Sequence, residues 1–498
     1  MKRKKLSGAI KTVLFLSLLM IGFLVLTRLM VRKESMERFK PYLDNAGEYD
    51  VVFIGNSHVV NDIFPFVLWR NYGIASYNLG GNGNTMPVTY WQMKLALSYA
   101  TPKLVVVDMN DLDLNDKVTG HSSNIHTTLD VFPISKMKYD ALCDLMDIPD
   151  VYDFDGNEIM KMRWEYLFTL GKYHSRWNQI NGNDLHPEYS KTKGAHVAID
   201  VQPPIAYEIT DEQMEESGWG FVYLRRIIEE CQARGIEILL VNLPYPASEK
   251  QQMSANTVYG LASQYGINYI NFVSMDQVVD YSVDLFDGNS HLNPSGANKV
   301  SDYLGKYILE HYEIPDRREE KAYQHWKEEY ETYVELKQRY VKAQMLLQNA
   351  LMLLHDEDYS LVCMMTSKSR WYDDNIILTL IQNIGREHVY EKDLYSKWSE
   401  LIFPLEQLDY AAMERVPYVY VLDRRLQKQF EGRGEDTLLE QQFSFGKLEY
   451  CATDKESLLT VNGINGSTWT VRAESEMVGI FILVFDSRTN ELVAELKY

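Results

Sequence analysis

Ser57 and His291 have the residue types and settings that nucleophilic chemistry needs. Ser57 stands in Gly-Asn-Ser-His directly after the apolar run 51–54, and His291 lies in a polar, turn-rich stretch before a long helical pattern. A serine hydroxyl becomes a nucleophile when a base takes its proton and an acid orients that base. Asp287 and Asp284 both lie near His291, and the sequence leaves this choice open. The structural alternative is that Ser57 only caps the next helix.

Three donors follow apolar runs that are predicted to be strands. They are the backbone N–H of Ser57, the backbone N–H of Gly83 in the glycine-rich loop 80–85, and the side-chain amide of Asn110. Because ligands gather at the carboxyl ends of parallel strands, we expect the three donors to meet at one edge. Preorganised donors of this kind stabilise the oxyanion of an acyl-transfer reaction.

The elements that must position these residues alternate along the chain. Apolar runs predicted to be strands span residues 51–54, 74–79, 102–108, 236–242 and 267–272. Helical patterns separate or follow them at 61–72, 87–99, 213–234, 248–265 and 294–312. Continuous apolar runs are typical of strands that are buried on both faces. The sequence therefore predicts an α/β fold, a three-layer αβα sandwich with a parallel sheet.

The alternation stops at residues 112–204, which are predicted to form a mostly helical insertion over one end of the sheet. In its Tyr-His-Ser-Arg-Trp run, His174 and Arg176 are candidates for binding an anionic substrate. A packed aromatic helix with a surface arginine is the alternative. The spacing of His121, His126 and His174 is irregular, so no metal site is expected.

The N-terminus has the pattern of a membrane anchor. Basic residues at 2–5 precede an uncharged, largely apolar run at 12–27. Since positive charge stays on the cytoplasmic side, the sequence predicts a single-pass helix with a cytoplasmic N-terminus and extracytoplasmic main domains. A cleaved signal peptide is the alternative, but residues 28–32 offer no small-residue cleavage site.

Composition and patterning bound the remaining possibilities. The formal net charge of −20 over 498 residues argues against nucleic-acid binding. The four scattered cysteines show no metal-binding spacing, and no cofactor is expected. The pattern divides the chain into an anchor at 1–33, an α/β domain at 34–316, a helical spacer at 317–356 and an α+β domain at 357–498.

Four short motifs resemble the sequence blocks of SGNH (GDSL-type) hydrolases. They are Gly-Asn-Ser-His at 55–58, the stretch 78–83, Asn-Asp at 110–111, and the stretch 287–291 followed by Leu-Asn-Pro-Ser-Gly. The resemblance covers about residues 48–312. It implies that Ser57 is the nucleophile and His291 the base. It also implies an oxyanion hole made by Ser57, Gly83 and Asn110.

The chain departs from that family pattern at three positions. Asn56 stands where Asp is usual, and Asp108 stands where Gly is usual. Gly288 occupies the usual position of the triad acid, so Asp287 is one residue early. These departures keep a second hypothesis open, in which a non-catalytic SGNH scaffold binds glycans or assists envelope assembly.

With its anchor, the chain resembles membrane-anchored SGNH-like proteins, namely DltD-like proteins and the alginate and peptidoglycan O-acetyltransferases. That resemblance implies an esterase or O-acyltransferase that handles acetyl or alanyl groups on a cell-envelope polysaccharide or teichoic-acid-like polymer. It also implies a membrane-bound O-acyltransferase as partner. Hydrolysis and transfer share their first half-reaction, and the sequence leaves the choice between them open.

The end of the chain resembles the interleukin-like EMT inducer module. The resemblance rests on the apolar run 478–485, the Asp486 that follows it, and Thr489 before a closing strand. It implies that the α+β domain binds carbohydrate.

Overall fold

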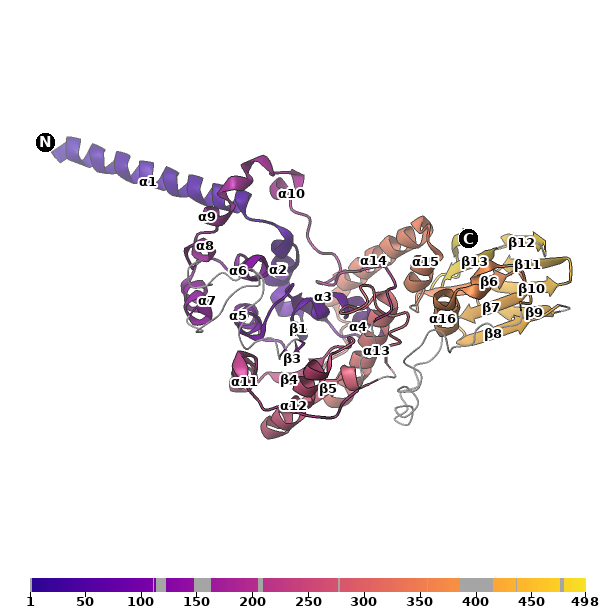
Figure 1. Cartoon of the computed structure of the whole chain (residues 1–498). Coiled ribbons are helices and arrows are strands. Elements are labelled where there is room, and N and C mark those ends of the chain that lie inside the picture. The colour runs from indigo at the N-terminus through magenta and orange to yellow at the C-terminus, as the bar shows by residue number, and fades with distance from the viewer. Residues whose placement is uncertain are drawn as a thin grey trace.

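The computed structural model describes residues 2–110, 112, 122–146, 163–204, 209–275, 278–355, 357–384, 415–435, 437–474 and 479–498 (Figure 1). Helix α1 (Lys2–Met30) projects from the body of the molecule. Its segment Ile10–Met30 has 21 residues with a mean hydropathy of 2.4, and only 6% of its apolar window is buried. A helix of this length, about 30 Å, matches the hydrocarbon core of a bilayer. By length and composition, α1 can span a membrane.

A parallel sheet forms the centre of the α/β domain. Its strands are β1 (Val51–Gly55), β2 (Ser76–Gly80), β3 (Leu104–Asp108), β4 (Glu237–Asn242) and β5 (Asn268–Asn271). The strand order is β2-β1-β3-β4-β5, and every pairing is parallel. Every residue of β1, β2 and β3 is buried, as their apolar runs predict.

Helices cover both faces of this sheet. Alternate residues of β1 enter two different cores: Val52 and Ile54 face one, and Val51 and Phe53 face the other. The first core is closed by α2 (Glu34–Asn45), α5 (Met86–Leu97), α11 (Gly218–Ala233) and α12 (Glu249–Tyr265). The second is closed by α4 (Pro65–Tyr72) and α13 (Pro294–His311). The predicted three-layer α/β fold is confirmed.

The turn after β1 differs from the expected one. In place of one helix over 61–72, the chain forms α3 (Ser57–Asn61) and then α4, which begins at Pro65. Asn56 caps α3, because its side-chain oxygen accepts a hydrogen bond from the His58 N–H at 2.9 Å. The alternative in which Ser57 itself is the cap is therefore wrong, and the Ser57 hydroxyl is left for other partners.

The described parts of the insertion are helical. They are α6 (Ser122–Leu129), α7 (Lys136–Met146), α8 (Arg163–Leu167), α9 (Thr169–Tyr173), a 3₁₀ helix (His174–Asn178) and α10 (Gly182–Leu185). Three of these elements, α9, the 3₁₀ helix and α10, contact the end of α1 that joins the body (Figure 1). The chain then returns to the sheet, where the His196 N–H donates to Val60 O at 2.8 Å.

The predicted spacer consists of α14 (Gln324–Ala343) and α15 (Leu347–Leu353). Trp326 and Tyr333 of α14 pack into the first core of the α/β domain, where the Tyr333 ring stacks on Phe66. Leu347 and Leu351 of α15 pack into the core of the C-terminal domain. The segment thus bridges two cores.

The C-terminal domain contains two antiparallel sheets, ordered β14-β13-β6-β7-β8 and β12-β11-β10-β9. The strands are β6 (Tyr359–Met365), β7 (Tyr418–Asp423), β8 (Lys428–Arg433), β9 (Leu438–Phe443), β10 (Gly446–Ala452), β11 (Glu456–Gly463), β12 (Thr468–Glu474), β13 (Ile480–Asp486) and β14 (Leu492–Lys497). Helices α15 and α16 (Asn375–Asn383) pack on one face of the first sheet, and the second sheet packs on the other.

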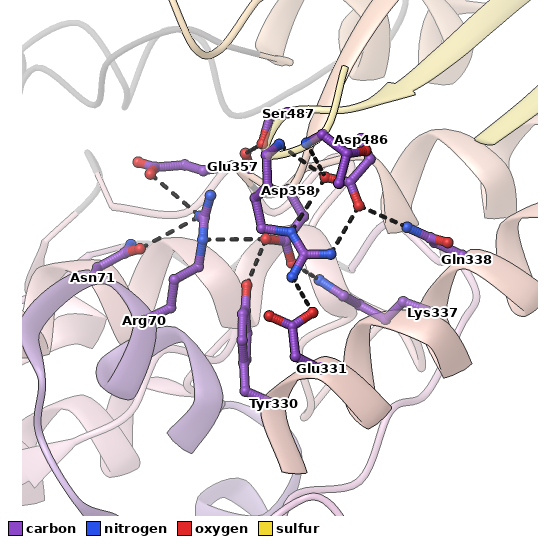
Figure 2. A network of polar contacts seen from close by, with 12 residues as sticks. Arg70, Asn71, Tyr330, Glu331, Lys337, Gln338, Glu357, Asp358, Asp486 and Ser487 are labelled. Atoms are coloured by element: carbon purple, nitrogen blue, oxygen red, sulfur yellow. Dashed lines mark hydrogen bonds and ion pairs between the residues drawn. The ribbon is translucent and has the colours of Figure 1, made fainter. Parts of the chain in front are cut away.

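A buried carboxylate, Asp358, connects the two domains (Figure 2). It accepts hydrogen bonds from Tyr330 Oη at 2.5 Å and Lys337 Nζ at 2.6 Å, both on α14. Arg70 Nε of α4 lies 3.1 Å away. Burial on its own would raise the pKa of Asp358, but the charges of Lys337 and Arg70 bring it below its ordinary value. The carboxylate therefore stays ionised between three elements of the fold.

Candidate active site

Ser57, His291 and Asp287 form one continuous hydrogen-bonded chain. Ser57 Oγ lies 2.7 Å from His291 Nε2, and His291 Nδ1 lies 2.6 Å from Asp287 Oδ2. The site stays open to solvent, since the side chains of His291 and Asp287 are 19% and 26% exposed. The sequence separation of 234 residues between Ser57 and His291 is closed by the parallel sheet, which brings the loops after its strands to one edge.

The turn from 287 to 291 explains how an acid that is one residue early still reaches the histidine. Gly288 adopts a φ of +76°, a conformation that side chains other than glycine disfavour. Asp287 Oδ1 accepts the backbone N–H groups of Ser290 at 2.9 Å and His291 at 3.0 Å, which leaves Oδ2 for the imidazole. The turn therefore directs the carboxylate of Asp287 toward Nδ1 of the His291 ring, four residues later.

Hydrogen bonding also sets the ionisation of Asp287. Partial burial would raise its pKa, but the imidazole of His291 and the backbone N–H groups of His291 and Ser290 together lower it well below its ordinary value. Asp287 is therefore a carboxylate throughout the neutral range, as an acid that orients an imidazole must be.

Asp284, the other predicted acid, is directed elsewhere. It is fully buried and pairs with Lys299 Nζ at 2.7 Å, accepts the Ser295 hydroxyl at 2.7 Å, and accepts the Asp280 N–H at 2.6 Å. These bonds tie the loop before α13 to the helix itself. The geometry thus distinguishes between the two acids that the sequence left open: Asp287 faces His291, and Asp284 faces Lys299.

The ring of His291 contacts two other rings. The centroid of His58 lies 4.8 Å away, and Phe286 is stacked at 5.6 Å. His58 is itself held, because its Nδ1 lies 3.0 Å from Asp62 Oδ2 and its Nε2 lies 3.2 Å from Ser290 Oγ. His58 is thus placed beside the base, in keeping with the prediction that it is not the base itself.

Asp62 is a residue that the sequence reasoning missed. Its Oδ2 faces His58, while its Oδ1 accepts the Leu292 N–H at 2.8 Å, so it fixes both the neighbouring ring and the backbone after His291. Burial raises its pKa well above the ordinary value, against the opposing influence of His291. The i, i+4 spacing of His58 and Asp62 was the available signal.

His196 was also missed. Its Nδ1 lies 2.9 Å from Asn61 Oδ1, and Asn61 Nδ2 donates to Ser57 O at 2.8 Å. Burial lowers the pKa of His196, and the charges of Arg38 and His291 act in the same direction. The segment that returns from the insertion is thereby attached to the end of α3, which begins at Ser57.

Asn110 follows β3 and is 3% exposed. Neither the nitrogen nor the oxygen of its side-chain amide has a hydrogen-bond partner among the residues that the structure describes. A buried amide of this kind costs free energy unless a ligand satisfies it. Gly83, the other predicted donor, lies in the loop after β2 with a φ of +62°.

Asp108 is the last residue of β3, two residues before Asn110, and it lies against Gly55 at the end of β1. Its Cβ would lie 2.8 Å from a Cβ built on Gly55, so only glycine allows β1 and β3 to approach this closely. Asp108 Oδ1 accepts the Leu243 N–H at 3.2 Å. Burial raises the pKa of Asp108 to about 7, opposed by the nearby His58.

The structure places His174 and Arg176 at the end of α1. Arg176 donates to Met30 O and lies 3.1 Å from both carboxylate oxygens of Asp184, whereas His174 is exposed and faces Gly171 O. His126 bonds Asp130 at 3.0 Å. His121 lies outside the described residues. No group of three or more potential metal ligands occurs in the described part of the chain.

Comparisons with known proteins add little to this geometry. No protein-family model and no curated protein sequence matches the chain. Several solved structures are similar to part of it, and two of them show the extent of the similarity. One, assigned to the G-D-S-L family of lipolytic proteins, from Desulfitobacterium hafniense, is 12% identical with a TM-score of 0.27 over 51% of this chain and 97% of its own. The other, assigned as an acylhydrolase, from Bacteroides fragilis, is 14% identical with a TM-score of 0.29 over 56% and 98%.

At such low scores these similarities carry no weight for the chemistry, which rests on the chain's own side chains. What the described residues define is a three-layer α/β domain with a partly exposed Ser-His-Asp chain at one edge of its parallel sheet. The buried amide of Asn110, unpaired among the described residues, follows β3, and β3 pairs with β1, the strand that precedes Ser57.

Proposed function

We propose that this protein is an SGNH-type serine esterase or O-acyltransferase that acts on ester-linked acyl groups. The observation that carries the proposal is the hydrogen-bonded order Ser57–His291–Asp287, with contacts of 2.7 and 2.6 Å. In this order the imidazole accepts the hydroxyl proton on one nitrogen while the carboxylate fixes its other nitrogen.

The first half-reaction forms an acyl-serine. Ser57 Oγ attacks the carbonyl carbon of the ester as its proton moves to His291 Nε2, and the carbonyl oxygen becomes an oxyanion. The Ser57 and Gly83 backbone N–H groups and the Asn110 amide are the proposed donors to that oxygen. When the C–O bond breaks, His291 returns the proton to the departing alcohol oxygen. Asp287 stabilises the imidazolium that exists between these two steps.

The second half-reaction releases the acyl group. A water molecule or a sugar hydroxyl attacks the acyl carbon, His291 takes its proton, and Ser57 then leaves with that proton. Water gives hydrolysis, and a sugar hydroxyl gives acyl transfer. The unpaired amide of Asn110 supports this scheme, because a substrate oxyanion supplies the acceptor that the buried amide lacks among the described residues.

The proposed substrate is an acetylated or alanylated polysaccharide of the cell envelope, with a membrane-bound O-acyltransferase as a partner. The features that support this location are the 21-residue apolar segment of α1 and the basic residues that precede it. The antiparallel sheets of the C-terminal domain are the proposed carbohydrate-binding part.

Protease added to intact cells tests the topology. It is expected to degrade everything beyond α1, and protection of the main domains would reverse this topology.

A non-catalytic SGNH scaffold is the less favoured function. Its main support was Gly288 at the usual position of the acid, and Asp287 faces the imidazole from one residue earlier. A fluorophosphonate probe, which phosphonylates activated serines, separates the two functions. The full-length chain should be labelled and should hydrolyse p-nitrophenyl acetate, and Ser57→Ala and His291→Ala should lose both properties. A parent chain without labelling or hydrolysis would contradict the enzymatic function.

A further inference from the structure

Large apolar side chains are exposed on the 3₁₀ helix and α10, which contact the end of α1, and on and next to α8, which packs on α9. Trp164 of α8 is 69% exposed, Phe168 is 42%, Trp177 of the 3₁₀ helix is 70% and Leu185 of α10 is 61%. The helices α9 and α10 and the 3₁₀ helix contact α1, and α8 packs on α9 (Figure 1). Exposed aromatic residues at the end of an apolar helix are typical of the membrane–water interface.

A polar cavity of about 310 Å³ lies among the same elements. Its lining consists of Arg32, Lys33, Arg176, Gln179, Asn181, Asn183 and Asp184. Three cationic side chains thus face one carboxylate, in a protein whose overall formal charge is −20. The chemistry of this lining, cations and side-chain amides, suits a phosphate group.

The cavity is rigidly attached to α1. Lys33 Nζ donates to Arg28 O at 2.7 Å and Leu29 O at 3.3 Å, and Arg176 donates to Met30 O. These bonds satisfy carbonyl groups that the last turn of a helix leaves unpaired. The cavity therefore begins two or three residues beyond the apolar segment Ile10–Met30, at the depth of lipid headgroups when α1 spans a bilayer.

Arg176 retains donors for a ligand. A guanidinium has five N–H donors. The hydrogen bonds of Arg176 to Met30 O and to the two oxygens of Asp184 engage three of them, considering the part of the chain that the structure describes. Asp184, with a pKa below its ordinary value, is an ionised counterion that holds Arg176 in place. The cavity is thus preorganised and still net positive.

We propose that the insertion forms a membrane-seated collar around the end of α1, in which the exposed aromatic residues enter the interfacial layer and the cavity binds the phosphate of an anionic phospholipid. The proposal rests on the anchoring role of α1 in the proposed function. The collar supplies local positive charge where an otherwise acidic protein would be repelled by an anionic bilayer. It would hold the α/β domain in a fixed orientation on the membrane.

Entry of the exposed aromatic side chains into the bilayer is tested with the full-length chain in phosphatidylcholine vesicles. These vesicles carry brominated acyl chains, which quench tryptophan fluorescence at short range. Trp177→Phe and Trp164→Phe together are expected to remove most of the quenchable fluorescence. Trp469→Phe, in β12 of the C-terminal domain, is the matched control and should leave it unchanged. If the quenchable fraction is the same in the double variant and in the control, the collar does not enter the bilayer.

The headgroup part is tested by binding of phosphatidylglycerol against phosphatidylcholine to the detergent-solubilised chain. Arg32→Gln and Arg176→Gln should each reduce the preference for phosphatidylglycerol about fivefold. Arg472→Gln, an exposed arginine of β12, should not change it. Since Arg176→Gln also removes a helix cap, Arg32→Gln carries the test if the former unfolds. An unchanged preference in Arg32→Gln, or competition by inorganic phosphate with no preference between the lipids, would overturn the lipid assignment.

The same samples keep this inference separate from the proposed enzyme. Fluorophosphonate labelling of Ser57 in detergent should be unchanged in Arg32→Gln. Loss of lipid preference with intact labelling supports the collar, whereas an unlabelled parent with normal lipid preference would overturn the enzymatic function alone.

Discussion

Two of the serine, histidine and aspartate clusters in the described part of the chain are connected in different orders. In the first, His291 stands in the middle, with Ser57 on Nε2 and Asp287 on Nδ1. In the second, Ser295 stands in the middle: its hydroxyl donates to Asp284 at 2.7 Å, and its Oγ lies 3.0 Å from His355 Nδ1. His355 Nε2 faces Leu380 O at 3.1 Å.

The two clusters also differ in their solvent exposure and in how their carboxylate charge is neutralised. Ser295 and Asp284 are fully buried, and Lys299 neutralises the carboxylate at 2.7 Å. In the first cluster the imidazole and carboxylate remain partly exposed. The same three residue types therefore support a fold in one place and suit catalysis in the other. What distinguishes them is which group lies between the other two, and whether a substrate can reach the serine.

Replacing the serines should give the largest contrast. Ser57→Ala is expected to lower the rate of ester hydrolysis on the order of 10⁴-fold or more, because Ser57 is the proposed site of the acyl intermediate. Ser295→Ala should retain activity per folded molecule and lose about 1 kcal/mol of stability with its buried hydrogen bond. Initial rates on p-nitrophenyl acetate and thermal melts measure both. Equal activity losses in the two variants would break the contrast.

Replacing each aspartate with asparagine tests which of the two orients the histidine of the site. Asp287→Asn should reduce kcat/KM by about 10³- to 10⁴-fold with little change in Tm, since the imidazole loses its orienting acceptor. Asp284→Asn should leave Lys299 buried without a charge partner and cost roughly 3 kcal/mol of stability. If Asp284→Asn abolished catalysis in the folded protein while Asp287→Asn did not, Asp284 would be the acid of the site.

His58 sharpens the comparison, because its ring lies beside that of His291, with centroids 4.8 Å apart. His58→Gln is expected to lower kcat by about 10- to 100-fold with KM nearly unchanged. The His58 ring, which Asp62 holds, is expected to position the His291 ring without contacting the substrate. Steady-state kinetics measures this split. A rise in KM at constant kcat would instead place His58 in substrate binding.

Asp108 should have the smallest effect on catalysis and a distinct effect on stability. Its folded pKa of about 7 lies above the ordinary value, so the folded state keeps a proton that the unfolded chain releases. Stability should therefore fall as pH rises from 4 to 7, by up to about 1.4 kcal/mol per pH unit from this group. Urea unfolding of Asp108→Asn should show a flatter pH dependence over that range. An identical slope in both proteins would contradict this assignment.

Local patterns in the sequence predicted the sheet and the Ser57–His291 pair. Apolar runs identify strands that are buried on both faces, and parallel strands bring their carboxyl ends together. The choice of Asp287 over Asp284 depends on a turn with Gly288 at positive φ and on two backbone N–H groups, which residue spacing does not encode. The catalytic roles themselves stay predictions.

Long-range packing accounts for what the sequence did not anticipate. Arg176 was a candidate for substrate binding from its sequence motif alone, and the insertion folds back and brings it to the end of α1. Asp62 acts between α3 and the loop of Leu292, which is 230 residues away. The charged segment of α14 reads as a spacer, yet its aromatic face packs against Phe66 and Trp69. In each case the partner lies far along the chain.

The most direct test compares the two clusters within one molecule. The full-length chain is treated with a fluorophosphonate probe, digested, and the adduct is located by tandem mass spectrometry. The order of groups around His291 predicts an adduct on Ser57 and none on Ser295, with loss of esterase activity in proportion to the labelling of Ser57. An adduct on Ser295, or an active enzyme whose Ser57 remains unlabelled when activity is lost, would contradict the assignment of Ser57 as the nucleophile.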